Sequence, residues 1–297
     1  MIRTILLSLA LPMIASAQLE GVFDLHVHSA PDSGPRSIDA IEVAQLARRH
    51  GMRGLLLKNH YSETASMAYL VSRVVPEVEA YGGIVLNRAV GGINPSAVEH
   101  LARKTGGLGK VVWMPTFDSE HYHRVSQPNP KHVPVAKDGA LLPETLAVLD
   151  VMARLGLALA TGHSSPEESL LLIRAAKQRG IERIIVTHPG PAPVAMSIEL
   201  QKQAAALGAF LEYPFSPTLP PNPHWPGGTV PMDEYLRMIR EVGPEHVILT
   251  SDLGQAMNPT HTDGLKAFQA ALREASFSAA EIDRMGKVNP ARFLGLE

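Results

Sequence analysis

Cysteine is absent from the 297 residues of this chain. Its absence excludes disulfide bonds, thiolate nucleophiles and cysteine-ligated zinc, and leaves histidine, carboxylates and lysine for any metal chemistry. An excess of one charge is lacking too, because the net charge is −2 and only 19% of residues are charged. The scattered Lys and Arg residues form no basic stretch that would bind nucleic acid. We therefore expect no nucleic-acid partner, and a hydrophobic content of 45% indicates a sizeable core.

The one long apolar segment, near the start of the chain, is too short to span a bilayer. Arg3 precedes an apolar stretch at 5–15 that Pro12 interrupts, and Ala15-Ser16-Ala17 has the small-x-small pattern of a cleavage site. These features predict a signal peptide at residues 1–17, a secreted or periplasmic protein of residues 18–297, and no membrane attachment after cleavage. A buried or membrane-anchoring N-terminal helix is the alternative.

Short apolar segments alternate with helical patterns along the rest of the chain. We expect eight strands, at 23–29, 53–57, 83–90, 110–115, 157–161, 182–187, 209–213 and 246–250. The expected helices are 38–50, 63–75, 95–104, 143–155, 166–179, 196–207, 232–242, 262–275 and 279–294. Eight such units in one domain predict an α/β fold of the (β/α)8 TIM-barrel type. An open doubly wound sheet is the alternative, but no Gly-x-Gly-x-x-Gly follows any expected strand.

Two histidines lie two residues apart on the first expected strand. His26 and His28 should project from the same face, with Leu25 and Val27 turned to the opposite face. Two imidazoles on a rigid strand supply half of a divalent-metal site. A hydrogen-bonded histidine pair without metal is the alternative interpretation.

Further potential ligands stand where other expected strands end. His163 follows the fifth strand, His188 the sixth and Asp252 the eighth. The carboxyl ends of the strands in a (β/α)8 barrel meet at one opening, which is where such barrels carry their functional groups. The sequence therefore predicts a metal centre at this opening.

These motifs together resemble the amidohydrolase superfamily of metal-dependent hydrolases. The resemblance covers the whole predicted mature chain and is carried by F-D-L-H-V-H (23–28), T-G-H (161–163), T-H-P-G (187–190), T-S-D (250–252) and the closing N-P-A-R-F-L-G-L (289–296). It implies that His26, His28 and Asp252 bind one metal ion. It also implies that His163 and His188 bind a second ion, or that one of them joins the first site.

The resemblance further implies a reaction. A metal-bound water would attack a small-molecule amide, lactam, lactone or ester, with Asp252 as general base and with His188 and Lys58 as further catalytic residues. One or two divalent ions, with zinc as the expected metal, would be the cofactors. The alternatives are a decarboxylase with a single metal ion on the same barrel and a metal-binding protein without turnover.

The chain departs from this resemblance at the end of the fourth expected strand. Members with two metal ions usually carry a carboxylated lysine or a glutamate there, whereas residues 113–118 read Trp-Met-Pro-Thr-Phe-Asp. Lys58, Asp118 or Glu120 would have to bridge two ions, or the site holds one. Lys58 could instead face a substrate carboxylate or an oxyanion.

A second resemblance is to PHP-type phosphoesterases. It rests on D-L-H-V-H-S (24–29) and K-N-H (58–60), and it would make His60 a ligand. That family expects a glutamate where residues 86–88 read Leu-Asn-Arg, and D-x-H where 252–254 read Asp-Leu-Gly. The phosphoesterase interpretation therefore ranks below the amidohydrolase one.

Two long loops, 116–142 and 214–231, follow the fourth and seventh expected strands and should overhang the opening. They could form lids, with Trp225 closing on the substrate, or contact a neighbouring subunit in a homo-oligomer. His121 in the first loop is an open candidate ligand. Arg36 and Lys58 near strand ends are candidate contacts for an anionic group on the substrate.

Overall fold

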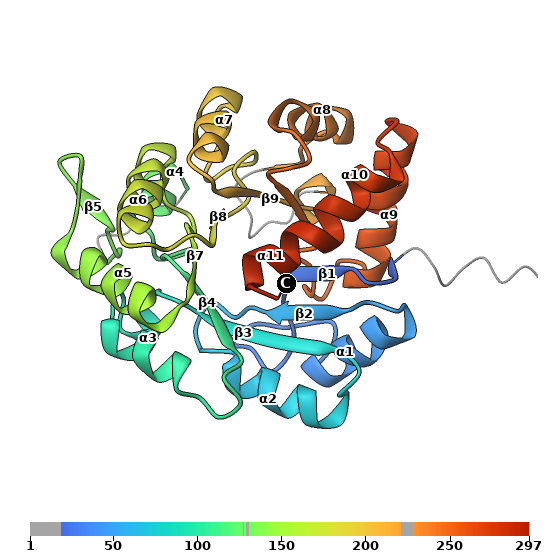
Figure 1. Ribbon diagram of the computed structural model, residues 1–297, viewed down its shortest axis with the longest axis horizontal. Coiled ribbons are helices and arrows are strands. Elements are labelled where there is room, and N and C mark those ends of the chain that lie inside the picture. The colour runs from blue at the N-terminus through green and yellow to red at the C-terminus, as the bar shows by residue number, and fades with distance from the viewer. Residues whose placement is uncertain (1–18, 127, 129–130, 221–227, 297) are drawn as a thin grey trace, which may run out of the picture.

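Eight parallel strands form a single sheet in the computed structural model, which describes residues 19–126, 128, 131–220 and 228–296 (Figure 1). Their order is β1-β2-β3-β4-β7-β8-β9-β10. The strands are β1 (Phe23–Val27), β2 (Gly54–Leu57), β3 (Glu79–Val85), β4 (Gly109–Trp113), β7 (Ala158–Ala160), β8 (Ile184–Val186), β9 (Phe210–Pro214) and β10 (Val247–Thr250). The predicted α/β barrel is thereby confirmed.

The sheet closes into a barrel because the first and last strands meet. The backbone N–H of His28 donates to the carbonyl of Leu253 (2.8 Å), and the N–H of Asp252 donates to the carbonyl of His26 (2.8 Å). We call this junction of β1 and β10 the seam. Two expected metal ligands from the start of the chain thus lie beside one from near its end.

Eight helices cover the outside of the barrel. They are α1 (Ala40–Arg49), α2 (Ala65–Val74), α3 (Pro95–Ala102), α5 (Pro143–Leu155), α6 (Pro166–Gln178), α7 (Ile198–Ala206), α8 (Met232–Val242) and α9 (His261–Glu274). At the N-termini of α1, α3, α6, α7 and α9, a side chain accepts a hydrogen bond from an otherwise unpaired backbone N–H group; Asp39 with Glu42, and Ser165 with Glu168, form capping boxes. Their apolar faces bury the outward side chains of the strands, as Val43 and Val71 do against Leu55.

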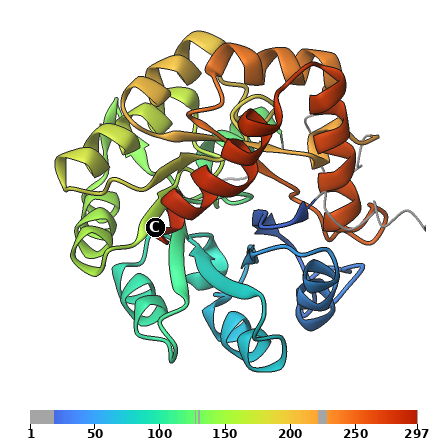
Figure 2. The ribbon, with the colours of Figure 1, turned by 45° about the vertical axis from the view of Figure 1, so that its right-hand side comes forward.

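The C-terminal segment closes one end of the barrel. The single helix expected at 279–294 is divided into α10 (Ala279–Asp283), a π-helical turn η4 (Arg284–Val288) and α11 (Asn289–Leu294). Figure 2 shows this segment, in red, lying across the barrel. Phe293 and Leu294 of α11 are buried in one cluster with the interior side chains Phe23, Leu56 and Trp113.

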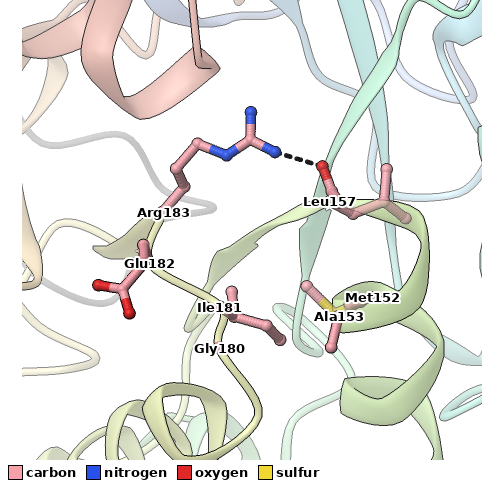
Figure 3. A pocket seen from close by; sticks show the side chains of 8 residues that line it. Met152, Ala153, Leu157, Gly180, Ile181, Glu182 and Arg183 are labelled. Atoms are coloured by element: carbon pink, nitrogen blue, oxygen red, sulfur yellow. Dashed lines mark hydrogen bonds between the residues drawn. The ribbon is translucent and has the colours of Figure 1, made fainter.

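Arg183 fastens α11 to this end, which is the end where the strands begin. Its guanidinium donates to the carbonyl of Leu294 (2.9 Å) and to that of Gly156. Figure 3 shows the Arg183 side chain among the residues that line a small cavity, including Ile181 and Met152. The cavity has a volume of about 110 Å³. Because the amino end of the barrel is plugged, the opposite end is the one left for a functional site.

Three more expected segments differ from the structure. The third strand begins at Glu79 rather than 83, and Gly82 within it allows a close approach to α2, since a Cβ there would lie 2.3 Å from the backbone of Thr64. Its expected end instead forms the short 3-10 helix η2 (Arg88–Val90). The loop expected at 116–142 contains α4 (Glu120–Val125) and a hairpin of β5 (Ala136–Lys137) and β6 (Ala140–Leu141), and a second 3-10 turn, η3 (Ser216–Thr218), follows β9.

The predicted signal peptide lies outside the described residues. Among the helices of the described part of the chain, none has the length and apolar character needed to cross a bilayer.

Candidate metal centre

A β-bulge near the end of β1 directs both of its histidines inward. The pairing of β1 with β2 shifts register between Asp24 and Val27. Leu25 therefore points into the barrel interior, whereas Val27 packs outward beneath α1 and α2. The prediction that Leu25 faces away from His26 and His28 was wrong, because a bulge changes the alternation of a strand. The two imidazole rings lie 5.1 Å apart.

Asp252, just after β10, meets these two histidines across the seam. Its Oδ1 lies 2.9 Å from Nε2 of His26 and 3.1 Å from Nε2 of His28. We call these three residues the triad. Within the described chain they are the one group of at least three His, Asp or Glu residues whose ligand atoms all lie within 4.8 Å of one another.

The spacing of the triad fits a divalent ion. An ion bound at 2.0–2.2 Å places neighbouring ligand atoms of its shell about 2.8–3.1 Å apart at right angles and about 3.3–3.6 Å apart at tetrahedral angles. Imidazole and carboxylate together suit zinc, manganese, iron or nickel. His26, His28 and Asp252, the three ligands predicted for one ion, therefore lie close enough together to hold it.

Electrostatics favours a cation at the triad. Burial alone would lower the pKa of His26, but the carboxylates of Asp252 and Glu212 raise it to about 9. Burial would raise the pKa of Asp252, but His26 and His28 hold it well below its usual range. The space between His26 and Asp252 thus favours positive charge, which a proton or a metal ion can supply.

Lys58 contacts the triad directly. It follows β2, its side chain is buried, and its Nζ lies 2.9 Å from Nε2 of His26. Burial lowers the pKa of Lys58 to about 8, although Asp252 and Glu212 act in the opposite direction. The lysine is therefore part of the site rather than an exposed residue at a strand end.

His163 and His188 form a second, adjoining pair. Their ring centroids are 4.9 Å apart, and the ring of His188 stacks on that of His26 at 6.3 Å. Burial lowers the pKa of His188 to about 4 and that of His163 well below its usual value, so both rings are neutral near pH 7. Neutral imidazoles can bind metal, but this pair lies outside the compact triad.

Unusual backbone conformations set these side chains in place. His188 has φ of +26° and Asp252 has φ of +51°, values that non-glycine residues seldom adopt. Two glycines permit close contacts nearby: a Cβ on Gly162 would lie 2.2 Å from the carbonyl of Met114, and one on Gly254 would lie 1.8 Å from the carbonyl of His28. Strain of this kind concentrates at functional sites.

Arg36 lies at the edge of the triad. Its Nη2 is 3.4 Å from Nδ1 of His28 and 2.5 Å from a carboxylate oxygen of Asp32. Arg36 is thus held beside the triad by its ion pair with Asp32. Trp225, a further predicted substrate contact, lies outside the described residues.

The candidate bridging residues have different surroundings. Lys58 contacts the triad, whereas Asp118 accepts the backbone N–H of Arg88 (2.9 Å) and Glu120 lies 3.9 Å from His132. The end of β4 therefore brings no carboxylate into contact with the triad among the interactions of the described residues.

Of the two remaining histidine candidates, His60 contacts a histidine of the triad, whereas His121 has its contacts elsewhere. His60 stacks on His28 at 5.0 Å, with its Nδ1 held 2.9 Å from Oγ1 of Thr116. Both ring nitrogens of His121 have partners away from the triad, in the carbonyl of Pro193 (2.8 Å) and the guanidinium of Arg124 (2.9 Å).

Aromatic rings cover the second histidine pair from the side of β4. Phe117 contacts the rings of His60 (4.4 Å) and His163 (5.4 Å), and Tyr122 of α4 lies 5.6 Å from His163. These residues give the opening an apolar wall beside His60 and His163.

The sequence analysis missed Glu212, on β9. This buried carboxylate lies 2.7 Å from Nδ1 of His26. Burial would raise the pKa of Glu212, but the charge on His26 lowers it, so the group is ionised. A single glutamate inside the apolar segment A-F-L-E-Y at 209–213 was the signal that could have revealed it.

A family model described as a family of unknown function, DUF6282, matches residues 21–212. The chain belongs to the DUF6282 family. Among curated proteins, none matches the sequence.

Solved structures share the fold of this DUF6282 protein. An amidohydrolase from Pseudomonas aeruginosa has a TM-score of 0.64 at 12% identity, with 93% of this chain and 96% of that chain covered. A structure from the engineering of organophosphate hydrolysis activity into a weak, promiscuous lactonase has a TM-score of 0.61 at 15% identity, with 95% and 98% covered.

A probable 2-pyrone-4,6-dicarboxylic acid hydrolase from Acinetobacter baumannii, with citric acid bound, has a TM-score of 0.60 at 15% identity, with 93% and 99% covered. These neighbours are hydrolases of the amidohydrolase superfamily and its phosphotriesterase-like branch. The predicted resemblance to that superfamily is confirmed at the level of the fold.

Proposed function

We propose that this DUF6282 protein is a metal-dependent hydrolase of small molecules. The observation that carries the proposal is the convergence of Nε2 of His26, Nε2 of His28 and Oδ1 of Asp252 at the seam, beside the buried cation of Lys58. The structural neighbours support the reaction class, since the names of several describe hydrolysis.

Each side chain has a distinct proposed role. His26, His28 and Asp252 would hold the divalent ion, which would supply an activated water and polarise the bond to be broken. Asp252 would accept a proton and pass it to the leaving group, and Ser216 holds its other oxygen at 2.8 Å. Lys58 stabilises negative charge that develops on the substrate, and His188 contacts the substrate or a second ion.

The preferred substrate is a lactone or ester that carries a carboxylate. Arg36 and Lys58 place positive charge on two sides of the triad, and Phe117 offers an apolar surface for a ring. The names of a lactonase and of a hydrolase of a pyrone dicarboxylic acid point to the same bond and the same charge in structural neighbours. Amides and lactams follow as further candidate substrates.

Metal content and turnover test the proposal together. Protein purified without a His-tag is assayed for bound metals, then stripped, reloaded with zinc or manganese, and screened against carboxylated lactones, esters, amides, lactams and phosphoesters. We expect one or two ions per chain and turnover of a lactone or ester only after reloading. The double variant with His26→Asn and His28→Asn should lose both the bound metal and the turnover. The control His100→Asn, at an exposed site on α3, should keep the metal and the turnover.

Several outcomes would redirect the proposal. One ion per chain with release of CO2 from a carboxylic acid would identify a decarboxylase, and turnover of phosphoesters alone would identify a phosphoesterase. Failure of zinc and of manganese to bind would overturn the metal-dependent mechanism.

We also propose zinc as the native metal and a secreted or periplasmic location. The histidine-rich ligand set supports the first, and the pattern of residues 1–17 supports the second. Determination of the mature N-terminus after expression in a Gram-negative host tests the location, with Gln18 as the expected first residue.

A further inference from the structure

We propose that Glu212 is a positioning residue that fixes the metal-binding nitrogen of His26 and, through the same carboxylate, the backbone of His188. The proposal rests on the metal centre proposed above. It assigns to β9 a role that none of the sequence motifs contains, and it makes one side chain responsible for two parts of the site.

The contact with His26 determines which ring nitrogen faces the triad. Oε1 of Glu212 lies 2.7 Å from Nδ1 of His26, and an ionised carboxylate can only accept a hydrogen bond. Nδ1 must therefore carry a proton. In the neutral ring this leaves the lone pair of Nε2 directed at Asp252, where a metal ion would bind.

The contact with His188 uses the second oxygen of the same carboxylate. Oε2 of Glu212 accepts the backbone N–H of His188 at 3.3 Å, at the residue whose φ is +26°. Because this conformation is unfavourable for a non-glycine residue, it needs surrounding contacts to hold it. Glu212 supplies one of them, and so helps to keep the His188 ring against His26.

Glu212 is itself firmly held. It is 3% exposed, and the hydroxyl of Thr250 donates to its Oε1 at 3.0 Å. Thr250 ends β10, two residues before Asp252. The carboxylate thus contacts β1 and the loop after β8, which carry His26 and His188, and the last residue of β10, which lies two residues before Asp252.

An amide cannot replace this carboxylate. In Glu212→Gln, one orientation presents the amide oxygen to His26 and the NH2 group to the N–H of His188, so two donors face each other. The opposite orientation restores the His188 contact but presents NH2 to Nδ1 of His26. That ring nitrogen then has to accept, which moves the proton to Nε2 and blocks the metal-binding position.

The affinity of the purified full chain for zinc tests the proposal. We expect Glu212→Gln to weaken zinc binding by about 10–100-fold, measured by competition with a chelator, because loss of a hydrogen-bond partner behind a ligand has effects of that size. The matched control is Tyr213→Phe, which removes a buried hydrogen bond to Gln201 from the neighbouring position of the same strand. Its zinc affinity should stay within about twofold of the wild type.

A second measurement reports on His26 without activity. In the wild type, the Nδ1 proton held by the carboxylate should give a downfield ring N–H resonance by NMR, and the ring 15N shifts should show Nδ1 protonated. Glu212→Gln should lose the downfield resonance, and Tyr213→Phe should keep it.

Thr250→Val provides a milder variant in case Glu212→Gln does not fold. It removes only the hydroxyl that donates to Oε1 of Glu212, and we expect a loss of zinc affinity about two- to tenfold, smaller than that of Glu212→Gln.

The outcomes separate this proposal from the one it rests on. Equal zinc affinities for Glu212→Gln and Tyr213→Phe, with the His26 resonance unchanged, would overturn the role of Glu212 while leaving the metal centre intact. If the wild type binds neither zinc nor manganese, the proposed function fails, and an unchanged His26 resonance in Glu212→Gln then overturns the positioning role as well.

Discussion

The two ends of the barrel are built from the same eight strands but have opposite chemistry. The carboxyl end buries His26, His28, Asp252 and Lys58 in mutual contact. The amino end is filled by α11, with Phe293 among the interior apolar side chains. Burying charged groups is unfavourable unless they pair with one another or with a metal. The difference therefore indicates that the amino end contributes stability and the carboxyl end contributes chemistry.

Of the changes that test this difference between the two ends, Asp252→Asn should have the largest effect, which is a loss of catalytic activity. The amide removes the proposed base and a charged ligand, so kcat/KM for a hydrolysed lactone should fall about 10²–10⁴-fold. Steady-state assays at saturating zinc measure this loss. Asp150→Asn, at an exposed position on α5, is the control and should retain activity. Full activity in Asp252→Asn would contradict the proposed role of Asp252 as general base.

Phe293→Ala should reduce the stability of the protein rather than its zinc binding, in contrast to the loss of activity expected for Asp252→Asn. Loss of this buried ring at the amino end should reduce the free energy of unfolding by about 3–5 kcal/mol, because it leaves a cavity in the core. Urea denaturation measures the change, with Val288→Ala at an exposed position as the control. Zinc affinity of the folded variant should stay close to that of the wild type, and a large drop would show that the two ends are not separable.

Arg183→Met should weaken the amino end to a smaller degree. The variant keeps most of the apolar stem but removes the hydrogen bonds to the carbonyls of Leu294 and Gly156. We expect a loss of about 1.5–3 kcal/mol in the free energy of unfolding. Arg174→Met on the exposed face of α6 is the matched control, and equal stability of the two variants would contradict the fastening role.

The smallest effect concerns acid stability at the carboxyl end. His261, which begins α9 there, is buried, and neither ring nitrogen has a hydrogen-bond partner among the described residues. Burial lowers the pKa of His261 to about 3. The unfolded chain, with an ordinary pKa near 6.5, therefore binds more protons between about pH 3 and 6.5, and stability falls as the pH falls through this range.

Removal of His261 should flatten that dependence. Between pH 7 and 5 the histidine contributes about 2 kcal/mol of lost stability, which His261→Gln should abolish. Urea denaturation at several pH values measures the slope, which is independent of any change in overall stability. His100→Gln, at an exposed position, should leave the slope unchanged, and equal slopes for His261→Gln and the wild type would contradict the assignment.

The sequence predicted the barrel and the triad because both follow local rules. Alternating apolar strands and helices define a parallel barrel, and residues at strand ends of such a barrel converge whatever their separation in sequence. His26, His28 and Asp252 could therefore be placed together, although 224 residues separate His28 from Asp252. The direction of Leu25 could not be predicted, because the bulge depends on the pairing of β1 with its neighbours.

Glu212 was missed for a related reason. Its function arises from contacts with His26, 186 residues away, and with His188, 24 residues away, and no motif records them. The break of the last helix at η4 likewise depends on how α11 enters the barrel interior. Long-range packing of this kind has no periodic signature in the sequence.

The seam also bears on how the protein is made. Translation produces β1 first and β10 last among the strands, so His26 and His28 leave the ribosome more than 220 residues before Asp252. A prematurely terminated chain that stops at residue 212, where the family-matched region ends, carries both imidazoles but lacks the acid that completes the triad. The proposed metal centre would therefore be complete only in a chain that has been synthesised through Asp252 and has closed its barrel.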